Sequence, residues 1–509
     1  MITSRPRRAA ALAATAALAL APLATLTVAA DASTAPPSSP ATARAEATAA
    51  GSLWAPRRAE AQLYGSREST RVSLPVRFVA GEAPLELWSN RPSYGEQIRT
   101  VWKAPDGDVT LPTGSMSTFN ALDDFVRISA KNLRTGKRLK SRLADVCLNS
   151  YGGERVRPDA PAYSPYPQYC FANPYSLGSV QGVQAGWSSP LFGEEGRGVR
   201  LTRGQWEVTT TVTPRYARAL RLSPQQATAT TRVAVTREHD HDDHDHGEGE
   251  GHSHGAGRTP APDARPAAAA PTGPEQADVE GPQPNLRSLP AWGIDMAGNG
   301  NYLRFAATVW NAGDSPLVVD GFRRAGGKPM MDAYQYFFDA SGEQTGYQQI
   351  GSFEFDTKPS HQHWHFRDFA SYTLLRADKS TAVVSKKEAF CLANTDSIDQ
   401  TVPGADWNPE NTDLSTDCGS PGSQSLRQVL SAGWGDTYAQ FRAGQSFSLK
   451  GLPNGTYYIA TIANPADRLV ESDYDDNVAL RRIVIGGKPG ARTVKVPKIG
   501  IIEEPTEQW

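Results

Sequence analysis

The sequence predicts an all-β protein with two tandem immunoglobulin-like β-sandwich domains, and three observations support this prediction. The chain contains 45 Gly and 38 Pro among 509 residues, which favours turns and linkers over long helices. Its β-branched and aromatic runs are short, and no long segment has clean helical periodicity. Several motifs of the first half recur in the second half in the same order.

The clearest strands lie in the second half. Residues 455–465 (GTYYIATIANP) and 477–485 (NVALRRIVI) are rich in β-branched and aromatic residues. Residues 303–319 (LRFAATVWNAGDSPLVV) predict a strand, a turn at 311–314 and a second strand. Short strands separated by turns are typical of a β-sandwich.

The recurring motifs indicate a diverged duplication. They are Asp-Phe at 124–125 and 368–369, Cys-Leu at 147–148 and 391–392, and Ala-Gly-Trp at 185–187 and 432–434. Chance similarity between strand sequences is the alternative. We favour duplication because the order and the offset are nearly constant.

The remaining segments divide the chain. Residues 1–30 resemble a signal peptide, with Arg5, Arg7 and Arg8 before a long Ala/Leu run. A membrane anchor is the alternative, but no stop-transfer charges follow, so we expect a secreted protein without a stable membrane span after cleavage. The other predicted segments are a disordered stretch at 31–58, domains at 59–237 and 284–487, a disordered His/Asp- and Ala/Pro-rich linker at 238–283, and a tail at 488–509.

Charge and cysteine content narrow the class of protein. The formal net charge of −2 gives no argument for binding nucleic acid. Cys147 lies close in sequence to Cys170, and Cys391 to Cys418, so we predict one local disulfide in each domain. Four free buried thiols are the alternative, which is less suited to an exported chain.

The nine histidines fall into two clusters. His361, His363 and His365 alternate, so on a strand their imidazoles lie on one side and suit Cu(II) or Zn(II). An exposed polar stripe is the alternative, and spacing alone does not choose between the metals. The second cluster lies in the linker and consists of His239, His241, His244, His246, His252 and His254. It predicts either a segment that binds metal weakly and gathers it for the downstream site, or a flexible spacer.

Four segments resemble the lysyl oxidase family in the same order, within roughly Pro284–Ile485. They are 360–376 (SHQHWHFRDFASYTLLR), 386–395 (KKEAFCLANT), 435–441 (GDTYAQF) and 464–478 (NPADRLVESDYDDNV). The resemblance implies copper held by His361, His363 and His365. It also implies a lysine tyrosylquinone cofactor made from Lys387 and Tyr438, with Lys386 next to the proposed lysine.

The resemblance implies a copper-dependent amine oxidase. Such an enzyme uses molecular oxygen to convert primary amines, with peptidyl lysine as one candidate substrate, to aldehydes, and it releases hydrogen peroxide and ammonia. This chemistry needs a neutral Lys387 amine during cofactor formation, and a base that takes a proton from the substrate; Asp436 is a candidate. The acidic run 471–477 resembles a segment that holds calcium in some family members, and a solvated turn is the alternative.

The first domain lacks the proposed chemical residues. At the equivalent positions it has Ser117, Phe119 and Ala121 for the three histidines, Leu143 for Lys387 and Leu191 for Tyr438. We therefore predict a non-catalytic domain that serves substrate docking, surface attachment or shielding of the active site. For the whole protein, the alternatives are an extracellular copper-storage protein and a structural β-sandwich adhesin, neither of which needs the Lys387–Tyr438 pair.

Overall fold

The fold is known from a computed structural model. It describes residues 48–63, 67–170, 172–192, 198–237, 270–272, 274–276, 280–298, 300–324, 330–357, 362–385, 389–409, 414–439 and 445–504. All of these belong to one unit of the chain, residues 47–509. The predicted signal peptide and the histidines of the linker lie outside the described residues. In the described ranges, no helix is long and apolar enough to cross a membrane.

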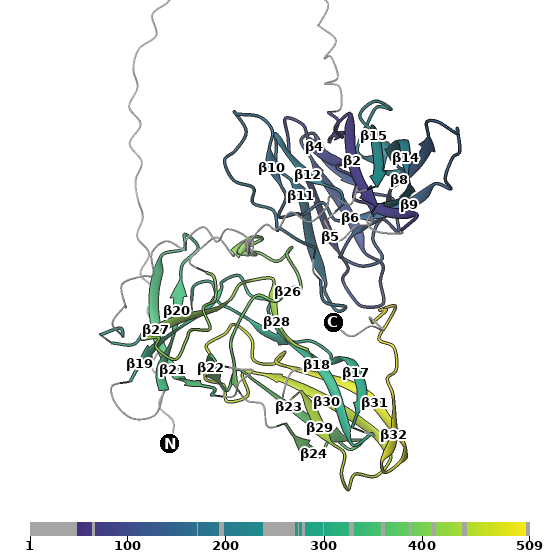
Figure 1. Ribbon diagram of the computed structural model, residues 1–509. Coiled ribbons are helices and arrows are strands. Elements are labelled where there is room, and N and C mark those ends of the chain that lie inside the picture. The colour runs from purple at the N-terminus through teal and green to yellow at the C-terminus, as the bar shows by residue number, and fades with distance from the viewer. Residues whose placement is uncertain are drawn as a thin grey trace, which may run out of the picture. The chain divides into compact units, whose positions relative to one another are not determined.

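The all-β prediction is confirmed (Figure 1). The described strands of the first half form four sheets. The first contains β1 (Gly51–Trp54), β4 (Arg77–Ala80), β12 (Trp187–Pro190) and β10 (Glu154–Arg155), and the second contains β11 (Gly178–Val183), β5 (Leu85–Asn90), β6 (Arg99–Ala104) and β7 (Gly107–Thr110). The third contains β13 (Val199–Thr202) and β3 (Ser69–Val72), and the fourth contains β2 (Arg58–Leu63), β15 (Thr228–Arg237), β14 (Gly204–Val212), β8 (Leu122–Asn132) and β9 (Arg142–Val146). One short helix, α1 (Pro214–Ala219), follows β14.

The described strands of the second half form three sheets. The first contains β16 (Leu286–Ser288), β18 (Tyr302–Asn311), β28 (Trp434–Tyr438) and β26 (Asp396–Ser397), with β17 (Trp292–Ala297) and β29 (Ser446–Ser448) also paired to β18. The second contains β25 (Ala389–Phe390), β22 (Trp364–Arg367), β21 (Gln344–Phe355), β20 (Met330–Phe338), β19 (Leu317–Arg323) and β27 (Ser425–Leu430). The third contains β24 (Thr381–Val384), β23 (Ala370–Arg376), β30 (Gly455–Ala463), β31 (Val478–Lys488) and β32 (Ala491–Lys495). None of these sheets combines strands of both halves, so each half has its own framework.

The strands predicted from sequence are present. Residues 455–465 form β30, 477–485 form β31, and 303–319 form β18 and β19. β18 and β19 join different sheets, so the turn between them links two layers and does not close a hairpin. Strand propensity therefore located the elements, but it carried no information about their partners.

Two strands lie outside the predicted domain bounds. Residues 51–54, which we expected to be disordered, form β1, which pairs with β4 and buries Leu53. Residues 491–495, which we assigned to the tail, form β32, which pairs with β31. Each strand has only four or five residues and few large apolar side chains, so pairing with a neighbour fixes it rather than its own composition.

The two predicted disulfides are confirmed as Cys147–Cys170 and Cys391–Cys418, with Cα–Cα distances of 5.9 and 5.7 Å. Further parallels between the halves favour the duplication, which stays a prediction. Buried Gln181 accepts a hydrogen bond from the backbone N–H of Leu148, and buried Gln428 accepts one from Leu392. Trp206 and Tyr457 each donate to the carbonyl four residues earlier.

A fully buried aromatic cluster stabilises the second half. The Phe305 ring stacks on Phe447 at 4.8 Å between centroids and meets Tyr372 edge-on at 5.4 Å. Aromatic pairs of this geometry contribute beyond their buried area, by about 0.5–1.5 kcal/mol each. The cluster lies under β18 and β23, two strands from different sheets.

We predict that Phe305→Ala lowers the free energy of unfolding of the second half by about 3–5 kcal/mol, because it leaves a cavity that the sheets cannot fill. Urea unfolding followed by tryptophan fluorescence measures the loss. Tyr302→Ala is the matched control: Tyr302 lies on the same strand but is 48% exposed. Equal losses in the two variants would contradict this account of the core.

Candidate functional site

Two of the three proposed metal-ligating histidines lie together at the start of β22. Trp364 and Phe366 point into the core, and because a strand alternates, His365 points to the opposite face. The Nε2 atoms of His363 and His365 are 2.9 Å apart, and His365 is only 5% exposed. The two imidazoles therefore lie on one side, while their role as metal ligands stays a prediction; His361 lies outside the described residues.

A carboxylate lies behind the histidine pair. Asp356 Oδ2 is 4.0 Å from Nδ1 of His365, and the backbone N–H of Asp356 donates to the carbonyl of His363. A carboxylate near the second ring nitrogen of a ligating histidine favours the tautomer whose other nitrogen is free to bind metal. Asp356 therefore suits the orientation of His365 that points Nε2 toward His363.

This donor set fits a copper ion in chemistry and placement. Neutral imidazole nitrogens suit Cu(II), and two of them converge on one point next to a buried strand. Among the described residues, no group of three or more His, Cys, Asp or Glu side chains could hold a metal ion. Since His361 is outside those residues, copper binding stays a prediction.

Tyr438 ends β28 and is half-buried against the hydrophobic core of the second half. Its phenol oxygen accepts a hydrogen bond from the backbone N–H of Cys391 at 3.0 Å and donates to the carbonyl of Cys391 at 3.2 Å. Its ring meets Phe390 edge-on at 4.7 Å. The phenol is therefore held by both the backbone and the side chain of neighbouring residues in one segment.

That segment, residues 389–391, begins with β25, which also contacts the strand of the histidines. Phe390 pairs with Phe366, and Ala389 pairs with Arg367. The backbone N–H of Trp364 donates to the carbonyl of Cys418, which is the disulfide partner of Cys391. The structure thus brings Tyr438 and the strand of His365 to the same two-residue element.

Lys387, Lys386 and Glu388 lie outside the described residues. Their place in the chain still limits the distance, because Lys387 is four residues before Cys391 and an extended chain spans at most about 14 Å over four residues. The proposed cofactor lysine is therefore tied by sequence to the residue that holds the Tyr438 phenol.

Sequence reasoning missed two polar residues beside Tyr438. Gln445 donates to the carbonyl of Tyr438 at 2.9 Å and lies near fully buried Tyr372. Burial and the nearby charge of Asp436 raise the pKa of Tyr372 well above its ordinary value, although Gln445 opposes the shift. Tyr372 therefore stays a neutral phenol, and no alternation or spacing in the sequence indicated its role.

Asp436, the candidate base, lies two positions before Tyr438 on β28, so both side chains point to the same face. It is 3% exposed. A second carboxylate, Asp396, lies on the adjacent strand β26. Burial raises the pKa of Asp396, although hydrogen bonds with Thr437 and Thr395 oppose the shift. A carboxylate with a raised pKa accepts a proton more readily than an exposed one.

The first half reaches the strand of Tyr438. Asn173 donates to Thr308 Oγ1 at 2.9 Å, and Thr308 Oγ1 lies 2.7 Å from Thr437 Oγ1. Asn173 and Thr308 are both buried. Parallel bridges at Ala172–Ser397 and Gly178–Asp399 fix the same segment beside β26. Thr437 is therefore connected, through Thr308, to Asn173, a residue more than 250 positions earlier in the chain.

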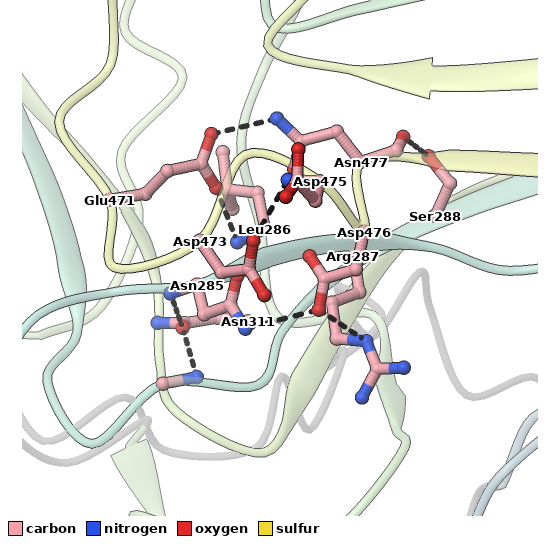
Figure 2. Close-up of polar contacts among 11 residues, drawn as sticks. Asn285, Leu286, Arg287, Ser288, Asn311, Glu471, Asp473, Asp475, Asp476 and Asn477 are labelled. Atoms are coloured by element: carbon pink, nitrogen blue, oxygen red, sulfur yellow. Dashed lines mark hydrogen bonds and ion pairs between the residues drawn. The ribbon is translucent and has the colours of Figure 1, made fainter.

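The acidic run 471–477 folds as a turn between β30 and β31 (Figure 2). Glu471 is 6% exposed and accepts hydrogen bonds from the Leu286 N–H and from the side chains of Asn464 and Asn477. The solvated-turn alternative is therefore wrong for Glu471, which joins this turn to β16.

Three buried oxygens in and beside this turn accept no hydrogen bond from the described part of the chain. They are Oδ1 of Asp476 and Asn477 in the turn, and Oδ1 of Asn285, which precedes β16. Burial raises the pKa of Asp476, and the charge of Asp473 raises it further, although Arg287 and Asn285 oppose the shift. Buried oxygens beside repelling carboxylates fit a calcium ion, which takes oxygen ligands from Asp, Glu and Asn.

We predict that Asn173→Ala lowers the free energy of unfolding by about 1–3 kcal/mol, because it leaves buried polar groups without their partner. Thermal and urea unfolding of the full chain measure the change. Asn454→Ala is the control, since it removes an exposed amide that donates to the backbone carbonyl of Gly487. The positioning argument fails if both substitutions have the same small effect.

Comparison with known proteins adds one finding. A family model described as Lysyl oxidase matches residues 341–493. The match contains all five predicted site residues. It begins at residue 341, whereas the resemblance described in the sequence analysis begins at about Pro284. The search of curated proteins finds no match to this chain.

Proposed function

We propose that the protein is a secreted, copper-dependent amine oxidase of the lysyl oxidase type, a proposal supported by the match of residues 341–493 to the family model described as Lysyl oxidase. Its substrates are primary amines, with peptidyl lysine as one candidate, and its products are an aldehyde, hydrogen peroxide and ammonia. The observation that carries the proposal is the shared contact of β25. This element pairs with the strand of His365 and packs on Tyr438.

The proposed mechanism assigns a task to each residue. His363 and His365, with His361, hold the copper ion, and Asp356 favours the ligating tautomer of His365. The backbone of Cys391 fixes the phenol oxygen of Tyr438, and Phe390 fixes the ring edge. Lys387 would supply the amine that joins the Tyr438 ring once copper and molecular oxygen have oxidised that ring, and the amine must lose its proton first. Copper and the finished cofactor, when present, supply the redox chemistry that passes electrons from amine to oxygen.

A base completes the proposed reaction. Asp436 lies on the same face of β28 as Tyr438 and is buried, which makes it our first candidate for accepting the substrate proton. Tyr372 and Gln445 position the end of β28 around it. The copper-storage alternative needs only the imidazoles, and the adhesin alternative needs none of these residues. Neither function requires a phenol fixed beside the segment of Lys387.

We predict that the copper-loaded wild-type protein stains for a protein-bound quinone and absorbs visible light. Tyr438→Phe and Lys387→Ala should reduce both signals to baseline and lower peroxide release from a panel of primary amines by at least about a hundred-fold. Lys386→Ala is the matched control and should keep the signal. No quinone in the wild type would favour storage, and loss in Lys386→Ala alone would move the cofactor lysine by one residue.

We predict that His363→Ala and His365→Ala lower the copper content of purified protein from one equivalent toward zero for the high-affinity site. Removing one of three imidazoles costs several kcal/mol of ligation, so affinity should fall by at least about 100-fold. Equilibrium dialysis against a competing chelator measures this affinity. The linker histidines could bind additional copper and change the number of ions per chain. Both substitutions are therefore made in a chain lacking residues 239–254. Unchanged affinity in both variants would place the copper site elsewhere.

We also propose that the turn 471–477 binds calcium through Asn285, Asp473, Asp476 and Asn477. The buried oxygens and the raised pKa of Asp476 support this. Because that pKa is raised, protons compete with calcium at a less acidic pH than at an exposed aspartate. The stabilisation by calcium should therefore be lost as the pH falls through the raised value.

We predict that calcium raises the melting temperature of the metal-stripped protein. Saturation at 100-fold above the dissociation constant adds about 2.7 kcal/mol to the free energy of unfolding. Asp476→Asn should remove most of the shift, whereas Asp467→Asn, an exposed aspartate of the neighbouring turn, should keep it. An equal calcium response in both variants would show that the turn is not the site.

A further inference from the structure

Two arginines face each other on a small sheet of the first half. In the antiparallel pair of β3 and β13, Arg71 lies directly opposite Arg200, and both are exposed. Like charges directly opposite each other destabilise a strand pair. Neither strand carries an acidic residue, because their sequences are STRV and VRLT. Arg200 also donates to Ser69 Oγ, and an anion bound between the two guanidinium groups would be attracted by both charges.

Two more cations border the same space. Lys140 and Arg142 lie at the start of β9, and together with Arg71 and Arg200 they line a cavity of about 250 Å³. Ile128 contributes an apolar wall. We call this space the cationic pocket. Its four positive charges suit phosphate oxygens, because each guanidinium can donate two parallel hydrogen bonds to them.

Positive charge continues beyond the cationic pocket. The connection between β8 and β9 exposes Arg134, Lys137 and Arg138. No acidic residue occurs from 125 to 144, although the whole chain has a net charge of −2. The charge is therefore concentrated in one place and extends over a longer track than a single phosphate needs.

We propose that the cationic pocket and this track bind a linear phosphate polymer and attach the protein to it through its first half. The pocket holds one phosphate group, and the exposed connection between β8 and β9 contacts the next groups along the polymer. The described lining contains no aromatic side chain on which a base could stack, so a polymer without bases fits better than single-stranded nucleic acid. This proposal does not depend on the amine oxidase function of the second half.

The test uses the full chain and long-chain inorganic polyphosphate as the probe, with binding measured at several salt concentrations. The variant R71Q/R200Q should weaken binding at least ten-fold and lower the slope of log affinity against log salt by roughly one per cation removed. K140Q/R142Q should act in the same direction. The melting temperature of R71Q/R200Q is measured in parallel, and a binding loss at an unchanged melting temperature would not reflect unfolding.

The matched control is R58Q/R232Q. Arg58 and Arg232 are also exposed and directly opposite each other, on β2 and β15, but Arg232 has Glu207 as its other cross-strand neighbour. Binding within two-fold of wild type in this control supports the cationic pocket. Equal losses in both double variants would overturn the proposal, since total charge alone would explain them. A base-containing strand of equal length that binds more tightly than polyphosphate would overturn the choice of polymer.

Discussion

The candidate site depends on the packing of one short element, β25, against two neighbours. Its Phe390 pairs with β22 on one side and meets the Tyr438 ring on the other. Two residues cannot hold that position alone. The Cys391–Cys418 disulfide and buried Gln428, which bonds both Leu392 and the carbonyl of Trp364, fix β25 against β22. A shift of this element would move the phenol and the imidazoles relative to each other.

The first half contributes to the same constraint. Asn173 reaches Thr308 and, through it, Thr437 beside Tyr438. Elsewhere, Trp407 of the second half packs between Trp88 and Tyr166 of the first half. A low-complexity linker suggests two domains that move freely, yet these buried contacts connect the halves directly. The first half therefore helps to position β28 through these contacts, and this role is independent of any ligand of its cationic pocket.

The sequence allowed the all-β class, the main strands, both disulfides and the shared side of His363 and His365 to be predicted. Each of these depends on local pattern or short sequence separation. The roles of Tyr372 and Gln445 could not be predicted, because they arise where β23 and the segment after β28 meet. The Arg71–Arg200 pair is likewise invisible until the register of β3 and β13 is known. Strands β1 and β32 were missed because their neighbours stabilise them more than their own composition does.

The most direct test of the central claim is peptide mapping of the full chain after copper loading in air. The account predicts a covalently joined pair of peptides, one containing Lys387 and the other Tyr438. The pair should be absent from protein kept without copper. Recovery of both peptides separately and unmodified, from a preparation that releases peroxide from amines, would contradict it.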